Sequence, residues 1–130
     1  MARLVADTHA LVWRLTAPRK LGRGAQRAFD AADSGRSLCI VPAIVFVELA
    51  LLRERGRLGV GPADVLRVVQ GRPGYAVLAL DAEQALEFAA HRGIRDPMDR
   101  LVLAAAQVAG GTLISADSVF DGRGIERVWD

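Results

Sequence analysis

Short runs of apolar residues alternate along the chain with longer stretches in which apolar residues recur every three or four positions. The short runs have the length and composition of buried strands, and they lie at residues 4–6, 38–41, 75–80 and 112–115, with a shorter run at 125–129 that would add a fifth strand. The longer stretches have helical periodicity and predict helices at residues 8–17, 22–33, 42–55, 63–70, 82–91 and 97–109.

The alternation of strands and helices predicts a parallel sheet with helices on both faces, because parallel strands are joined by crossover connections. We therefore expect an α/β fold, a three-layer α/β/α domain whose central sheet is mostly parallel and has four to five strands. Residues 1–130 fit a single domain, and no repeat, low-complexity tract or linker divides them.

The composition narrows the class of protein. The one cysteine, Cys39, excludes an internal disulfide and a zinc site of several cysteines, which favours a reducing compartment. No apolar run approaches the roughly 20 residues of a membrane span, and the first residues lack a signal-peptide pattern. We therefore expect a cytoplasmic protein without a membrane partner. Of the 17 basic residues only Lys20 is a lysine, and arginines favour planar contacts with phosphate or carboxylate groups.

Five acidic residues occupy positions from which their carboxylates could meet. Asp7 and Asp117 follow the first and fourth predicted strands, and ligands of parallel sheets bind at this carboxyl edge. Asp96 and Asp99 are three residues apart at the start of a helix, which places them on one helical face. Glu48 lies in a helix that is apolar nearly all round, where an unpaired carboxylate is unfavourable.

Each acid also has an ordinary structural explanation. An aspartate before a helix is a common N-cap, which would account for Asp7 and Asp96. Asp99 would be the third helical residue, where an acid interacts favourably with the helix dipole, and Asp117 could be a turn residue. The glutamate inside the apolar helix could pair with Arg53 or Arg100. Capping does not explain why all five acids fall at strand ends, helix starts and one apolar helix of a small sheet domain.

Gathered carboxylates repel one another, and a hard divalent cation held by oxygen ligands relieves that repulsion. We expect Mg²⁺ or Mn²⁺. Without the five acids, 10 acidic residues face 17 basic ones, so the remaining surface is strongly basic. A carboxylate-held metal beside such a surface predicts phosphoryl-transfer chemistry, with hydrolysis of a nucleic acid backbone as the first candidate.

Four segments in order along the chain resemble the PIN domain, specifically the small VapC-type toxins of toxin–antitoxin pairs. They are Asp7–Trp13, Val47–Leu49, Asp96–Ala106 and Leu113–Phe120. The resemblance covers nearly the whole chain, although residues 56–74 match no motif. It implies an Mg²⁺- or Mn²⁺-dependent endoribonuclease whose catalytic and metal-binding residues are Asp7, Glu48, Asp99 and Asp117.

The resemblance also implies supporting residues and partners. Asp96 and Thr8 would support the acidic quartet, and Ser115 stands where the family often has a hydroxyl that hydrogen-bonds the carboxylates. Arg100 could bind the substrate. The implied partners are a cognate VapB-like antitoxin, an RNA substrate and a second copy of the chain in a homodimer. We expect His9 to be a partner of a neighbouring carboxylate and Trp13 to be a core residue.

Two other functions are compatible with part of this pattern. A catalytically silent PIN-like module would use its acids only for folding or for binding a partner. A receiver-like signalling domain also gathers acids and Mg²⁺ on a parallel sheet, but its chemistry needs a lysine at a strand end. The only lysine, Lys20, follows Pro18 in a connecting stretch, which disfavours the receiver.

Overall fold

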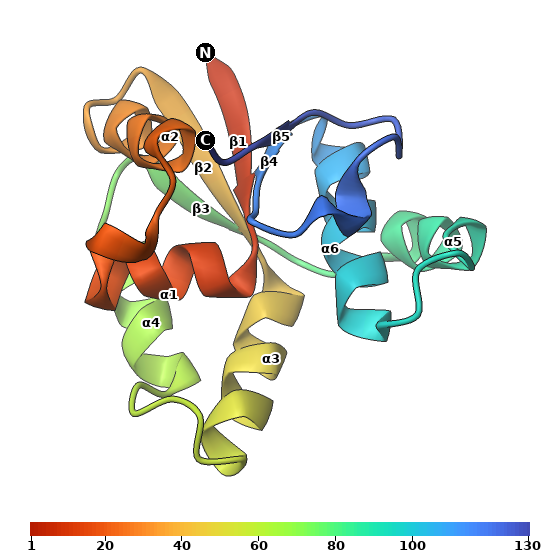
Figure 1. Cartoon of the computed structure of the whole chain (residues 1–130), viewed down its shortest axis with the longest axis horizontal. Coiled ribbons are helices and arrows are strands. Elements are labelled where there is room, and N and C mark those ends of the chain that lie inside the picture. The colour runs from red at the N-terminus through yellow and green to blue at the C-terminus, as the bar shows by residue number, and fades with distance from the viewer.

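The computed structural model describes residues 1–130 and consists of a five-stranded sheet surrounded by helices (Figure 1). In chain order the elements are β1 (Ala2–Ala6), α1 (Thr8–Thr16), η1 (Pro18–Lys20), α2 (Arg23–Asp33), β2 (Ser37–Pro42), α3 (Ala43–Glu54), α4 (Pro62–Gln70), β3 (Tyr75–Leu78), α5 (Ala82–Ala90), α6 (Pro97–Ala109), β4 (Thr112–Ile114), η2 (Ser118–Phe120) and β5 (Arg127–Val128). None of the helices is long and apolar enough to cross a membrane.

All five strands are parallel, in the order β3-β2-β1-β4-β5, so the predicted α/β class and sheet are confirmed. The strand predicted at residues 75–80 ends at Leu78, because Leu78 pairs with Pro42 and β2 gives way to α3 at the next residue. The predicted fifth strand shrinks to two residues. The short 3-10 helices η1 and η2 were not predicted, since three residues are too few for a periodic pattern.

Two hydrophobic cores lie on opposite faces of the sheet, as the alternation of side chains along a strand requires. In β1, Leu4 and Ala6 face the core formed with α1, α2 and α4, whereas Val5 faces the core formed with α6. In β4, Ile114 and Leu113 divide in the same way. Successive apolar residues of these strands therefore point to opposite faces of the sheet, so that each face needs a layer of helices to cover it.

Within the sheet, β1 has β2 as its neighbour on one side and β4 as its neighbour on the other, and the chain runs from β1 to β2 first. The two directions part at the carboxyl ends of β1 and β4, which is where open parallel sheets bind ligands. The helices α1 and α3 start from this edge, and Figure 1 shows α3 and α4 extending beyond it. The fold therefore places the residues that follow β1 and β4 side by side.

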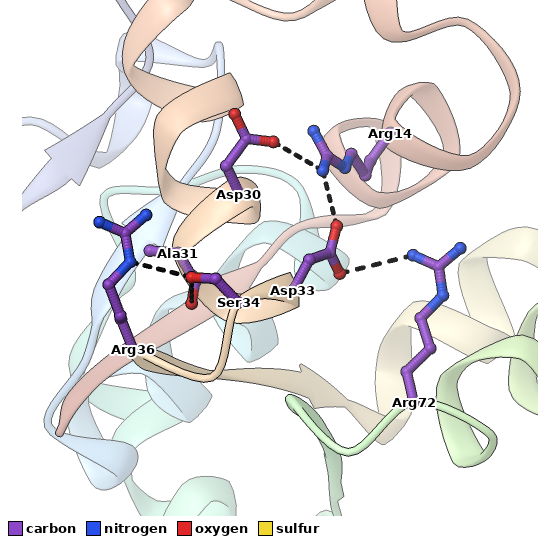
Figure 2. A network of polar contacts seen from close by, with 7 residues as sticks. All are labelled: Arg14, Asp30, Ala31, Asp33, Ser34, Arg36 and Arg72. Atoms are coloured by element: carbon purple, nitrogen blue, oxygen red, sulfur yellow. Dashed lines mark hydrogen bonds and ion pairs between the residues drawn. The ribbon is translucent and has the colours of Figure 1, made fainter.

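An arginine on α1 ties that helix to its neighbours (Figure 2). The Nη2 atom of Arg14 lies 2.8 Å from the Oδ1 atom of Asp30 and 2.6 Å from the Oδ2 atom of Asp33, both on α2. Arg72, in the turn before β3, contacts the other oxygen of Asp33 at 3.7 Å. The Arg14 side chain is only 13% exposed, so it is screened less than a surface pair. The network fixes the end of α1 that lies away from the sheet edge.

Gly74 precedes β3, and a side chain there would strike the carbonyl group of Ala32 at the end of α2. The Gly74 carbonyl accepts the Cys39 N–H at 2.8 Å, so the backbone cannot move away without weakening the β2–β3 pairing. We expect Gly74→Ala to lower the free energy of unfolding by about 1–3 kcal/mol, the usual cost of overpacking, measured by urea denaturation. Gly59→Ala is the matched control, because a Cβ at Gly59 meets nothing within 4 Å. Equal stability of the two variants would contradict this packing.

Candidate functional site

A cavity of about 420 Å³ opens at the carboxyl edge of the sheet. It lies between α1, α3 and α6, and all five acids singled out in the sequence line it. The lining consists of Asp7, Thr8, His9, Ala10, Trp13, Glu48, Asp96, Asp99, Val102, Ala116 and Asp117. The fold therefore brings together residues that are more than a hundred positions apart in the chain.

A larger hollow of about 620 Å³ lies at the other end of α6. It is lined by the exposed carboxylates of Glu83 and Glu126 and the half-buried carboxylate of Glu87. It also lies at the end of α6 that faces away from the carboxyl edge of the strands. The smaller acidic cavity is the better candidate, because its position and its electrostatics point to the same site.

Asp7 comes directly after β1 and is the N-cap of α1, which confirms the capping explanation predicted for it from the sequence. Its Oδ1 atom accepts the Ala10 N–H at 2.9 Å. Burial raises the pKa of the Asp7 carboxyl, while hydrogen bonds from the Ser115 side chain and the Ala10 amide and the nearby His9 lower it. His9 thus stands beside a carboxylate, as expected. The cap holds one oxygen of Asp7 and leaves the group at the cavity wall.

Asp96 and Asp99 occupy the start of α6. Asp96 caps the helix by accepting the Met98 N–H at 2.8 Å, so its capping explanation is confirmed, and it lines the cavity as well. Burial and, in decreasing order, the charges of Asp96, Asp117, Glu48 and Asp7 together raise the pKa of Asp99 to about 7. The charges of the other four acids therefore act on the Asp99 carboxyl, which means that the five acids converge as the sequence pattern predicts.

Ser115 and Asp117 follow β4, and Asp117 lines the cavity. The buried Ser115 hydroxyl accepts the Asp117 N–H at 3.1 Å, and Asp117 in turn accepts the Val119 N–H at 3.0 Å as the cap of η2. Because Ser115 also contacts Asp7, its hydroxyl links the acids that follow β1 and β4. Ser115 is thus next to the carboxylates.

Glu48 points from α3 toward α1, where the buried Thr8 hydroxyl donates a hydrogen bond of 2.5 Å to its Oε1 atom. The alternative that Glu48 pairs with Arg53 or Arg100 is wrong, since neither arginine forms an ion pair with it. A neutral donor holds the carboxylate and leaves its charge uncompensated. This arrangement places Thr8 beside the acids, which gives it a positioning role that its sequence pattern alone could not specify.

Arg100 does not line the cavity. Its Nε atom donates to the Ile94 carbonyl at 2.5 Å, its Nη2 atom donates to the Arg92 carbonyl at 3.2 Å, and its guanidinium lies 5.1 Å from the centre of the Phe88 ring. These contacts engage the side chain in the loop between α5 and α6. The expectation that Arg100 contacts a substrate has no support in this geometry, because the group is already committed to backbone carbonyls.

Trp13 is half-buried: it packs against the hydrophobic core that contains α1, as expected, and it also lines the acidic cavity. Its ring lies 5.7 Å from that of the exposed His9, centre to centre. The two residues are four positions apart on α1 and therefore share a helical face. The spacing of four between His9 and Trp13 is the sequence signal that places both rings on one side of α1.

The donor set fits a hard divalent cation, because it consists of carboxylate oxygens and because their mutual repulsion already raises the pKa of Asp99. As the side chains stand, no three acidic or histidine groups lie close enough together to hold one ion, so coordination by three of them requires side-chain rotation. The only thiol, Cys39, is buried, and burial raises its pKa to about 12, which excludes it as a nucleophile here.

Solved structures that share this fold include several toxin–antitoxin complexes. The VapBC2 complex from Rickettsia felis bound to a promoter DNA fragment has a TM-score of 0.73 at 14% identity, covering 98% of this chain and 99% of that chain. DNA-bound VapBC from Salmonella typhimurium has a TM-score of 0.68 at 19% identity and 98% coverage of each chain. VapC20 from Mycobacterium tuberculosis, described as a sarcin-ricin loop cleaving toxin, has a TM-score of 0.68 at 17% identity, covering 98% of this chain and 99% of that chain.

At these identities the likeness establishes the fold and nothing finer. A search of curated proteins finds no match to the sequence. The model of the PIN domain family, in contrast, matches residues 4–125, which include all five acids and every strand except the last. With the match extending over nearly its entire length, the chain belongs to the PIN domain family.

Proposed function

We propose that this protein is a divalent-metal-dependent endoribonuclease, a hydrolase of RNA phosphodiester bonds that acts as the toxin of a toxin–antitoxin pair. The observation that carries the proposal is the convergence of five carboxylates in one cavity, four of which raise the pKa of the fifth, Asp99. Such a cluster suits a cation better than it suits an empty cavity. A cation at the carboxyl edge of the strands suits phosphoryl transfer.

The residues that would hold Mg²⁺ or Mn²⁺ are Asp7, Glu48, Asp99 and Asp117. A bound ion of this kind lowers the pKa of water and offsets the charge that develops on a phosphodiester during displacement. Asp117 has one oxygen held by a backbone amide and Glu48 has one held by Thr8, so each of these two carboxylates keeps its other oxygen for the site. Asp7 is held by both the Ala10 amide and the Ser115 side chain.

The pKa of Asp99 near 7 belongs to the site without a cation, because burial and the other four carboxylates favour the neutral form. A bound divalent cation would favour the ionised form, as a metal ligand requires. After burial, the charge of Asp96 is the largest cause of the raised pKa of Asp99. The hydrogen bond of Asp96 goes to the Met98 amide and to no other acid, so its support of Asp99 is electrostatic. Ser115 fixes the acids after β1 and β4 relative to each other.

The proposed partners follow from the structural neighbours. The Rickettsia and Salmonella structures are complexes of a VapC-type chain with its VapB antitoxin, and we infer a VapB-like antitoxin for this chain. The Mycobacterium protein is described as cleaving the sarcin-ricin loop, which favours RNA as the substrate class. A homodimer and a cytoplasmic location stay predictions made from the sequence.

A catalytically silent PIN-like module is the second candidate. The presence of all four quartet positions in the cavity disfavours it, because a module that only binds a partner has no need of the repulsion at Asp99. The receiver-like alternative is set aside by the membership of the chain in the PIN domain family.

We predict that Asp7→Asn and Asp99→Asn each lower metal-dependent RNA cleavage by at least about a hundredfold, since each removes a charge from the proposed ion site while keeping the shape of the side chain. Cleavage of total RNA by the purified protein, with and without Mg²⁺, measures this. Glu83→Gln on α5 is the matched control, because it removes one exposed carboxylate outside the cavity. Excess EDTA should abolish the wild-type activity.

Two results would overturn the proposed function. Cleavage by the wild-type protein that persists undiminished in excess EDTA would contradict the metal mechanism. Growth arrest on expression that is unchanged by Asp99→Asn would show that toxicity does not depend on this site. Folding of each variant is checked by its urea midpoint, so that loss of structure is not mistaken for loss of catalysis.

The raised pKa of Asp99 also makes a prediction about stability in the absence of divalent ions. Because the folded protein binds this proton more tightly than the unfolded chain, ionised Asp99 disfavours the folded state above pH 7, and the penalty fades as the pH falls from 7 toward 3.8. In EDTA we expect Asp99→Asn to be more stable than the wild type at pH 8 by on the order of 1 kcal/mol, allowing for solvent screening. The difference should shrink by pH 5.

Addition of Mg²⁺ at pH 8 should stabilise the wild type and leave Asp99→Asn nearly unaffected, because only the wild type keeps the complete carboxylate set. Urea denaturation at pH 8 and pH 5, with Mg²⁺ or EDTA, measures both effects, and Glu83→Gln should behave as the wild type. A wild-type midpoint that is independent of Mg²⁺ and equal to that of Asp99→Asn at pH 8 would contradict the electrostatics described above.

A further inference from the structure

A further cavity, of about 470 Å³, is basic, in contrast to the acidic cavity at the carboxyl edge of the sheet. It lies between η1 and the start of α2, and its lining consists of Pro18, Arg19, Leu21, Arg23, Gln26 and Arg27. Three of these six residues are arginines and none is acidic. The proposed catalysis does not involve this cavity, so its charge needs another explanation.

The three arginines are exposed, and none of them has an ion-pair partner. Arg23 and Arg27 are four positions apart on α2 and therefore share one face of the helix, where like charges repel. The next acid on that helix, Asp30, is already bonded to Arg14 and does not line the cavity. An anionic ligand between the arginines would relieve this repulsion.

The basic cavity is connected to the acidic one along α1. The Nζ atom of Lys20, the last residue of η1, lies 5.7 Å from the centre of the Trp13 ring, and Trp13 lines the acidic cavity together with His9. In Figure 1, α1 leads from the end of β1 directly to η1, with α2 beyond it. Since α1 has nine residues, the helix itself is about 13 Å long.

The path therefore presents aromatic rings first and cations next. The exposed His9 ring and the half-buried Trp13 ring stand at the rim of the acidic cavity, where Trp13 also packs against Trp129 and lies under the Lys20 ammonium group. Lys20, followed by the three arginines, continues away from the cavity. Surfaces that bind single-stranded nucleic acid combine these two features, with bases stacked on aromatic rings and phosphates held by cations. Arginine suits the phosphates because its planar group donates two hydrogen bonds at once.

We propose that Lys20, Arg19, Arg23 and Arg27 bind the phosphates of a single-stranded RNA whose adjoining base stacks on Trp13, so that the neighbouring phosphodiester lies in the acidic cavity. We name these four cations the basic track. The proposal rests on the proposed function and adds to it the direction in which the substrate leaves the site. An acidic peptide could also meet the arginines, but it carries no bases for the rings of Trp13 and His9.

The experiment measures the affinity of a fluorescent single-stranded RNA of about twelve nucleotides, within the range of site sizes of such surfaces, for protein carrying Asp99→Asn. This background prevents cleavage during the measurement. Adding R19Q/R23Q/R27Q should weaken binding by on the order of tenfold or more and reduce the slope of log affinity against log salt by about 2, because each lost phosphate contact contributes about 0.7. Adding Trp13→Leu should weaken binding while leaving the salt slope unchanged.

The matched control is R55Q/R57Q/R67Q in the same background, which removes three exposed arginines from the α3–α4 region. It should bind RNA as the parent does. Equal losses in the two triple variants would overturn the basic track, since they would mean that net charge alone sets the affinity. Unchanged affinity and salt slope in R19Q/R23Q/R27Q would overturn it as well.

A polyglutamate peptide serves as the competing probe. If R19Q/R23Q/R27Q abolishes binding of this peptide and leaves RNA binding intact, the cavity is a site for an acidic protein segment and the basic track is wrong. The proposed function fails separately, when the wild-type protein cleaves no RNA with Mg²⁺. Cleavage by the wild type together with an unchanged KM for RNA in R19Q/R23Q/R27Q would leave the nuclease standing and overturn only the basic track.

Discussion

Repulsion between carboxylates at one edge of the sheet is the constraint on which the rest of the site depends. Three of the five acids in the cavity, Asp7, Asp96 and Asp117, are N-caps, each with one oxygen bonded to a backbone N–H. The positive ends of these helices offset part of the negative charge. The acids are therefore held together by the same bonds that start the helices, and the cluster cannot relax without loosening the fold around it.

This coupling separates two kinds of charge on a small surface. The five acids gather where β1 and β4 end, while three unpaired arginines gather beyond the far end of α1. The net charge of +2 hides this division, because it sums all 17 basic and 15 acidic residues of the chain. A chain with the same net charge and mixed placement would offer neither an ion site nor a path for a phosphate backbone.

The sheet and the acidic cavity could be predicted because both follow from local rules. Apolar runs such as residues 38–41 have no other place than a buried strand, and an acid directly after a strand must lie at the carboxyl edge. The contacts of Arg100, the Thr8–Glu48 hydrogen bond and the exposure of Trp13 could not be predicted. They depend on which loop, helix or ring packs alongside, and neither periodicity nor spacing carries that information.

The Arg14 network described above tolerates substitution unevenly. Asp33 has two cationic neighbours, Arg14 and Arg72, whereas Asp30 has only Arg14. Loss of Arg72 leaves both carboxylates with a partner. Loss of Arg14 leaves two acids one turn apart without a shared cation and releases the far end of the helix that forms part of the cavity wall. Substitution of Arg14 should therefore disturb the acidic cavity, although Arg14 lines neither the acidic nor the basic cavity.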